Sequence, residues 1–168
     1  MQAEPSPATS TTLTAAVMGH VLALVDRATL AVPVDTERHP AAAVIDDVLV
    51  LRCGGSYMHA LLLLQRFAAD PGQTSAPIGA VGEREHVTLE WRLPSGRLVV
   101  NELHGGSIRV PDLGLTAGPW TADVDVWGRQ EAADYEIELD EMDEELPGSA
   151  PDSPLGPEIW RIRLWPSS

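Results

Sequence analysis

Lysine is absent from this 168-residue sequence, and all 11 basic side chains are arginines. The 25 acidic residues outnumber them and leave a net charge of −14. Binding to nucleic acid or to an anionic membrane surface depends on clustered cations, so this balance argues against both. It favours a basic protein partner instead, because long-range attraction would speed the encounter with one.

Cysteine is nearly absent as well. Cys53 stands alone, which excludes an intramolecular disulfide and a cysteine-based zinc site and fits a reducing compartment. The apolar run 15–25 has no basic residue before it, is interrupted by His20 and is too short to span a bilayer. These features predict a cytoplasmic protein.

Motifs for catalysis are also missing from the sequence. No two of the five histidines lie three or four residues apart, so no helical metal pair is predicted. There is no Gly-x-Ser-x-Gly motif and no glycine-rich phosphate loop with a lysine. We therefore expect a protein that is not an enzyme and holds neither a metal nor a cofactor.

Short segments in which apolar and polar residues alternate make up much of the sequence. Apolar and polar residues alternate along His86 to Leu93, which is typical of a half-buried strand. Glycine and proline turns follow at short intervals, a spacing that predicts an antiparallel two-sheet β-sandwich. The other expected strands cover residues 28–34, 44–52, 57–67, 97–103, 107–110, 120–127 and 158–165.

The sequence predicts the secondary structure of the first half of the chain less clearly. Residues 1–11 are rich in proline, serine and threonine and predict a disordered tail, followed by one sandwich domain over residues 12–168. Residues 13–25 fit either a helix or a buried strand. The Gly54-Gly55 pair between two apolar runs favours a β-hairpin, although residues 61–69 could also begin a helix.

The exceptional segment is Glu131 to Glu145, which holds nine acidic residues and no base. Tyr135, Ile137 and Leu139 alternate with acids, so residues 135–140 predict a charged edge strand. Residues 141–145 would then be a solvated part of an acidic loop near 131–157. A calcium site is a weaker reading, because the Asp-x-Asp-x-Asp-Gly spacing is missing.

A charged edge can also be a docking surface. The residues that we expect at such a surface are seven acids of the segment together with an aromatic and a basic side chain just before it, which are Glu136, Glu138, Asp140, Glu141, Asp143, Glu144, Glu145, Trp127 and Arg129. An exposed tryptophan beside an arginine is a typical binding hot spot, and Trp165 with Arg163 is a second such pair.

Three motifs in the C-terminal half resemble a bacterial family. They are Leu89-Glu90-Trp91 leading through Pro94-Ser95-Gly96 to Val100, then Gly118-Pro119-Trp120 leading to Gly128-Arg129, and last the run from Ile159 to Pro166. Over residues 86–166 the chain resembles the competence protein J-like, immunity-type β-sandwich proteins, which include a nuclease inhibitor. The resemblance implies a sandwich that works by binding, with carboxylates occupying sites that phosphates would take.

Two functions follow as hypotheses. The first is an acidic inhibitor that neutralises a basic partner, with a nuclease-type toxin as the implied class. The alternative is a structural or assembly subunit that works through oligomeric contacts of its sheet edges and exposed tryptophans.

Overall fold

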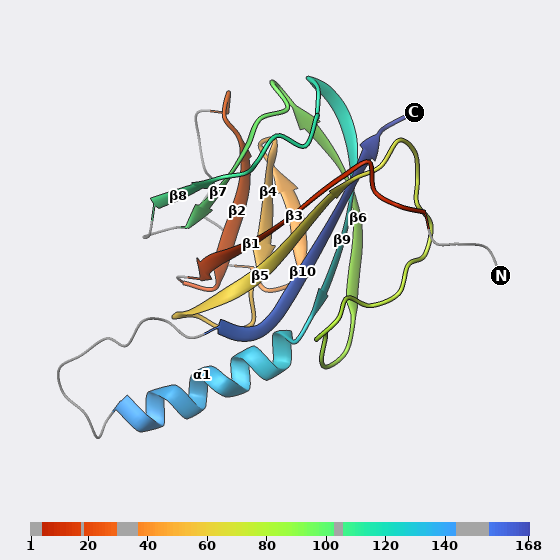
Figure 1. Ribbon diagram of the computed structural model, residues 1–168. Coiled ribbons are helices and arrows are strands. Elements are labelled where there is room, and N and C mark those ends of the chain that lie inside the picture. Colours follow the sequence, from red (N-terminus) through yellow and green to blue (C-terminus); the bar gives the residue numbers. More distant parts are fainter. Residues whose placement is uncertain (1–4, 18, 30–36, 103–105, 144–154) are drawn as a thin grey trace.

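The computed structural model describes residues 5–17, 19–29, 37–102, 106–143 and 155–168, and for residues 139–143 it describes the backbone alone. In these described residues, two five-stranded sheets pack face to face, and a helix crosses an end of the sandwich (Figure 1). The predicted β-sandwich is therefore confirmed. The expected strand at residues 28–34 falls largely outside the described residues.

The first sheet has the strand order β1-β5-β10-β9-β6. It contains β1 (Thr9–Val17), β5 (Met58–Arg66), β6 (Glu85–Leu93), β9 (Gly118–Trp127) and β10 (Leu155–Pro166). Its neighbours are antiparallel except for β5 and β10, which run parallel. Parallel pairing is possible because long segments of chain separate these two strands.

The second sheet has the order β3-β4-β2-β7-β8. It contains β2 (Val21–Asp26), β3 (Ala42–Ile45), β4 (Val48–Arg52), β7 (Leu98–Glu102) and β8 (Gly106–Arg109), all antiparallel. Leucines from β2, β4 and β5 meet Trp91 and Trp160 between the sheets, where both tryptophans are almost fully buried. Burial of these apolar side chains holds the sheets together.

Three local expectations are wrong. Residues 44–52 contain two strands, because Asp46 and Asp47 adopt φ angles of 50° and 62° and form a two-residue hairpin turn. The Gly54-Gly55 pair does not close a hairpin, since β4 and β5 belong to different sheets. The expected tail is too long, because β1 begins at Thr9.

The largest correction concerns the acidic segment. Its alternating half, residues 135–140, is part of helix α1 (Arg129–Asp143) and not an edge strand. Alanine, glutamate, leucine and methionine are strong helix formers, and Glu131 in the first turn interacts favourably with the helix dipole. The period-two alternation of three apolar residues was too short to outweigh this helix propensity.

Candidate partner-binding surface

Helix α1 follows β9 directly and extends beyond the end of the sandwich (Figure 1). Its first turn packs against the backbone of Gly54 and Gly55. A Cβ atom at Gly54 would overlap the carbonyl oxygen of Arg129, and one at Gly55 would lie 2.8 Å from that of Ala132. The two glycines therefore permit a close approach of helix and loop backbones, which is their role in place of a hairpin turn.

Glu158 is fully buried beneath this contact. Its carboxylate accepts hydrogen bonds from the Gly54 N–H at 3.2 Å and from Trp160 Nε1–H at 3.0 Å. Burial raises the pKa of Glu158 to about 7, against the lowering effect of the Gly54 N–H and the Arg129 charge. The adjacent Cys53 thiol also has a pKa well above its usual value, mainly because it is buried.

The buried carboxyl group makes stability depend on pH. The folded-state pKa of about 7 lies above the ordinary value of 4.5, so the folded protein binds this proton more tightly than the unfolded chain. The contribution of Glu158 to stability is complete below pH 4.5 and is lost as the pH rises through 7. The shift corresponds to a loss of about 3–4 kcal/mol over this window.

We expect urea denaturation to show this decline in wild-type protein and a flatter profile in Glu158→Gln. The comparison uses the slope of the unfolding free energy between pH 4.5 and 8, so a uniform destabilisation by glutamine does not obscure it. Equal slopes in the two proteins would contradict the assignment to Glu158.

Arg129 connects α1 to the sandwich. Its guanidinium donates to both carboxylate oxygens of Glu85, at 2.7 and 2.6 Å, and to the Arg38 carbonyl at 3.0 Å. Only 9% of Arg129 is exposed, and Trp127 is 5% exposed with the Arg161 guanidinium 5.0 Å from its ring centroid. Neither residue is available as the exposed binding anchor that the sequence suggested, and Arg163 of the second expected pair is buried as well.

The predicted acids are divided along α1. Glu136 is partly buried and lies 3.5 Å from Nε2 of His20, whereas Glu138 is exposed. Asp140, Glu141 and Asp143 belong to the C-terminal part of the helix, and Glu144 and Glu145 lie outside the described residues. No basic residue occurs in the last turn, so the negative end of the helix dipole coincides with negative side chains.

An exposed strip on α1 combines acids with one apolar side chain. We call Asp134, Ile137 and Glu138 the α1 strip; both acids are exposed, and Ile137 is 59% exposed. Ile137 and Glu136 also line a groove of about 430 Å³ between the helix and the sandwich. Sequence reasoning missed Ile137 because a strand would have turned it inward, whereas the helical spacing 134, 137 and 138 places it beside the two acids.

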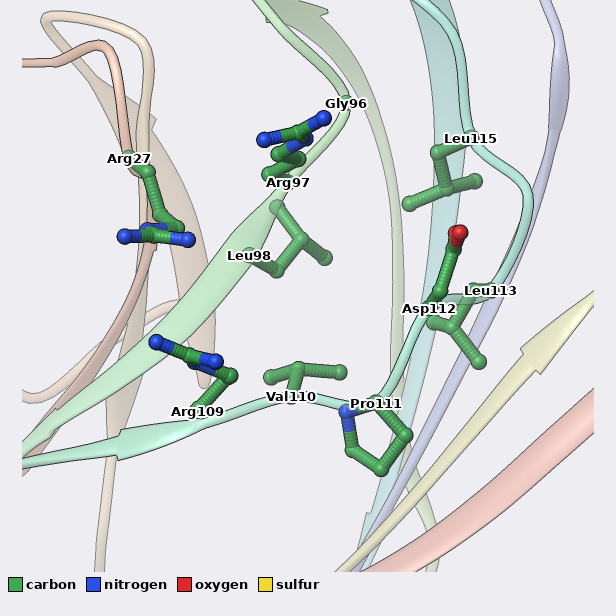
Figure 2. Close-up of a pocket in the computed structure, with 10 residues that line it drawn as sticks. All are labelled: Arg27, Gly96, Arg97, Leu98, Arg109, Val110, Pro111, Asp112, Leu113 and Leu115. Atoms are coloured by element: carbon green, nitrogen blue, oxygen red, sulfur yellow. The ribbon is translucent and has the colours of Figure 1, made fainter.

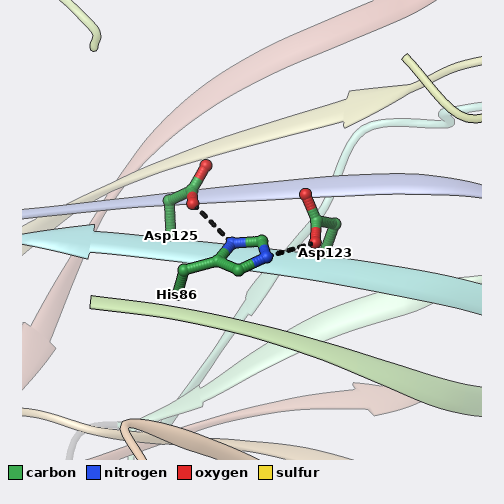
Figure 3. Close-up of side chains that lie close together, drawn as sticks. All are labelled: His86, Asp123 and Asp125. Atoms are coloured by element: carbon green, nitrogen blue, oxygen red, sulfur yellow. Dashed lines mark hydrogen bonds and ion pairs between the residues drawn. The ribbon is translucent and has the colours of Figure 1, made fainter. Parts of the chain in front are cut away.

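A second charged group lies on the first sheet, where strands β6 and β9 bring His86, Asp123 and Asp125 together (Figure 3). Their ligand atoms lie within 4.8 Å of one another, a spacing that could hold a metal ion. His86 Nδ1 is 2.8 Å from Asp125 Oδ1, and Nε2 is 3.3 Å from Asp123 Oδ1.

Arginines already occupy these carboxylates. Arg84 Nε donates to Asp125 Oδ1 at 2.7 Å, Arg161 donates to Oδ2 at 2.7 Å, and Arg163 pairs with Asp123. Burial would raise the pKa of Asp125, but the bonds from Arg161, Arg84 and His86 outweigh it and keep the pKa below its usual value. Three guanidiniums on two carboxylates disfavour an additional cation, so we interpret the group as an ion-pair cluster that joins β6, β9 and β10.

The cluster had a signal in the sequence. Asp123 and Asp125 are two residues apart on one strand, and Arg161 and Arg163 are two residues apart on another, so each pair shares a face. The register pairs Arg161 with Asp125 and Arg163 with Asp123. What the sequence lacked was this register, which decides whether the pairs meet.

Taken together, these features define a class: a two-sheet β-sandwich with an acidic helix anchored across one end. Two solved structures are similar to this chain. One is ComJ, inhibitor of the DNA degrading activity of NucA, from Bacillus subtilis, with a TM-score of 0.56, 11% identity, and coverage of 95% of this chain and 98% of ComJ. The other, described as crocagin biosynthetic gene J, has a TM-score of 0.45, 15% identity, and coverage of 95% and 96%.

The ComJ fold therefore extends over almost the whole chain, beyond the region 86–166 in which the sequence showed a resemblance. No family model and no curated protein matches the sequence. In the part of the chain that the structure describes, no helix is long and apolar enough to cross a membrane.

Proposed function

We propose that this protein binds and inhibits a basic, nuclease-type partner through the α1 strip. The observation that carries the proposal is the acidic helix α1, which has no base after Arg129, is held on the sandwich by Arg129 and presents Ile137 beside exposed acids. The ComJ fold supports it, because ComJ itself inhibits a DNA-degrading protein.

The mechanism is occlusion. A nuclease binds DNA phosphates with arginine and lysine side chains, and carboxylates make equally strong charge-assisted hydrogen bonds with the same groups. Asp134 and Glu138 would occupy these positions, while Ile137 beside them would be the apolar anchor of the contact.

The attachment of α1 contributes to affinity. The contact with Gly54 and the ion pair with Glu85 fix the start of the helix before a partner arrives, which reduces the entropy lost on binding. Basic groups of the partner would also interact favourably with the C-terminal end of α1, where no base lies in the last turn. The net charge of −14 would raise the association rate.

The test compares two charge-reversed proteins. Asp134→Lys with Glu138→Lys changes the α1 strip, and Glu83→Lys with Glu90→Lys makes the same change in net charge at two exposed acids elsewhere. Both are titrated into DNA-degradation assays with NucA and with any basic nuclease that is encoded beside the gene for this chain, at low and physiological ionic strength.

We expect the strip variant to inhibit about 10- to 100-fold more weakly than wild type, because two charged contacts are reversed. The control variant should inhibit less than about threefold more weakly than wild type, because only the long-range attraction is reduced. Failure of the wild-type protein to inhibit either nuclease, or equal losses in both variants, would overturn the proposal.

A further inference from the structure

Three exposed arginines surround a cavity at the end of the sandwich away from α1. Arg27 follows β2, Arg97 precedes β7 and Arg109 ends β8. The cavity measures about 240 Å³, and Figure 2 shows the arginines along one side with Leu113, Asp112 and Leu115 along the other. A concentration of cations is unexpected in a chain with a net charge of −14.

These arginines differ from Arg84, Arg129, Arg161 and Arg163, which form ion pairs with carboxylates. Within the described ranges, no carboxylate forms an ion pair with Arg27, Arg97 or Arg109. Asp112 on the opposite side accepts a hydrogen bond from the Gly114 N–H at 2.7 Å. Neighbouring guanidiniums repel one another, and a bound anion would remove this repulsion.

A buried carboxylate holds the loops that carry two of the arginines. Asp26 is 0% exposed and accepts hydrogen bonds from the N–H groups of Ser95 and Gly96 at 2.8 and 2.7 Å. The Arg27 N–H also donates to the Arg97 carbonyl at 2.7 Å. Gly96 has a φ of 76°, and a Cβ atom there would overlap the Leu115 carbonyl. The rim is thus positioned before any ligand arrives.

The floor of the cavity is apolar. Leu98, Val110, Leu113 and Leu115 line it and are each less than a tenth exposed. A charged rim above an apolar floor fits a ligand with an anionic group and a small organic body. The volume of about 240 Å³ is below the usual range for drug-sized ligands, which restricts the body to a few carbon atoms.

We propose that this cavity binds the phosphate group of a small organic phosphate. Guanidiniums offer planar pairs of N–H donors that match phosphate oxygens, and three of them suit a dianion better than the single charge of a carboxylate. The inference does not depend on the proposed inhibitory function, because the cavity and α1 lie at opposite ends of the sandwich (Figure 1).

The experiment follows backbone amide NMR shifts of the full chain during titration. The probes are ribose 5-phosphate, ribose, inorganic phosphate, sodium acetate and an oligothymidylate at equal phosphate concentration, with sodium chloride keeping the ionic strength constant. We expect ribose 5-phosphate to give saturable shifts at Leu98, Val110 and Leu115, inorganic phosphate weaker ones, and ribose and acetate none that saturate.

Single variants distinguish the cavity from general charge. Arg27→Gln, Arg97→Gln and Arg109→Gln should each weaken ribose 5-phosphate binding about tenfold, the effect of removing one charge-assisted hydrogen bond. Arg92→Gln, at an exposed arginine on β6, should leave binding unchanged. Because all these side chains are exposed, the variants are expected to fold.

Four results would overturn the proposal. They are no saturable shift with ribose 5-phosphate, the same shifts with acetate or chloride, equal losses in Arg92→Gln and the cavity variants, and stronger binding of the oligothymidylate per phosphate. The last would indicate a surface for nucleic acid in place of a small-molecule site. Normal phosphate binding by the α1 strip variant would show that the two proposals stand or fall separately.

Discussion

Asp125→Asn is expected to lower the free energy of unfolding by about 3–5 kcal/mol, the usual effect of removing one partner from a buried ion pair. Asp125 is fully buried and contacts Arg84, His86 and Arg161, with Arg163 at 3.6 Å. Asparagine keeps the shape but removes the charge, which deprives the buried guanidinium of Arg161 of the carboxylate it pairs with, while Arg163 keeps Asp123.

Urea denaturation at pH 7 measures this effect, and a double-mutant cycle assigns it to the ion pair. Asp125→Leu combined with Arg161→Met removes both partners, so the double variant should be less destabilised than the sum of the two single changes. Additive losses, or a loss below about 1 kcal/mol for Asp125→Asn, would contradict a stabilising cluster.

The same variant has a signature at low pH. The pKa of Asp125 is held below its ordinary value of 3.8, so its contribution to stability is present above that value and is lost as the pH falls through the folded-state pKa. The free energy of unfolding of Asp125→Asn should therefore depend less on pH below 3.8 than that of the wild type. Glu158 acts in the opposite direction at higher pH, and the two groups together predict maximal stability near pH 4–5.

Gly54→Ala is expected to lower the free energy of unfolding by a similar amount, about 3–5 kcal/mol, or to displace α1. A methyl group at this position overlaps the backbone of Arg129, which cannot rotate away as a side chain could. Moving the helix would also weaken the hydrogen bond from the Gly54 N–H to buried Glu158. Overpacking and a lost bond to a buried carboxyl group each cost about 1–3 kcal/mol.

Gly72→Ala is the matched control. Gly72 has a φ of 66° and open space where a Cβ would be, so its alanine variant bears only the cost of left-handed backbone, about 1–2 kcal/mol. Hydrogen exchange of the first turn of α1 should accelerate in Gly54→Ala and stay unchanged in Gly72→Ala. Equal stabilities for the two variants would show that the helix does not depend on the close approach at Gly54.

The strands were largely predictable because each carries its own pattern. Alternation along His86 to Leu93 and the Pro94-Gly96 turn follow from local rules, and both are present in the structure. Pairing was less predictable: the segments on either side of Gly54-Gly55 and of Pro94-Gly96 belong to different sheets. A turn signal shows where the chain reverses, but not which strand becomes the hydrogen-bonded neighbour.

The acidic composition of the candidate site was predictable from the sequence, but the set of side chains that it exposes was not. The run of acids from Glu131 to Glu145 is evident in the sequence, yet helix and edge strand place different side chains outward. Ile137 became part of the surface, and Trp127 and Arg129 became internal, only because residues 129–143 are helical and Glu85 lies beside the start of the helix.

The sequence by itself determined the mainly-β class, the strong negative charge and the position of the acidic segment along the chain, since these depend on composition and local periodicity. The tertiary structure decided the parallel β5–β10 pair, the burial of Asp123 and Asp125 under arginines, and the grouping of Arg27, Arg97 and Arg109 around one cavity. Each of these joins segments distant in the chain, and such contacts are set by sheet register and packing, which no local pattern encodes.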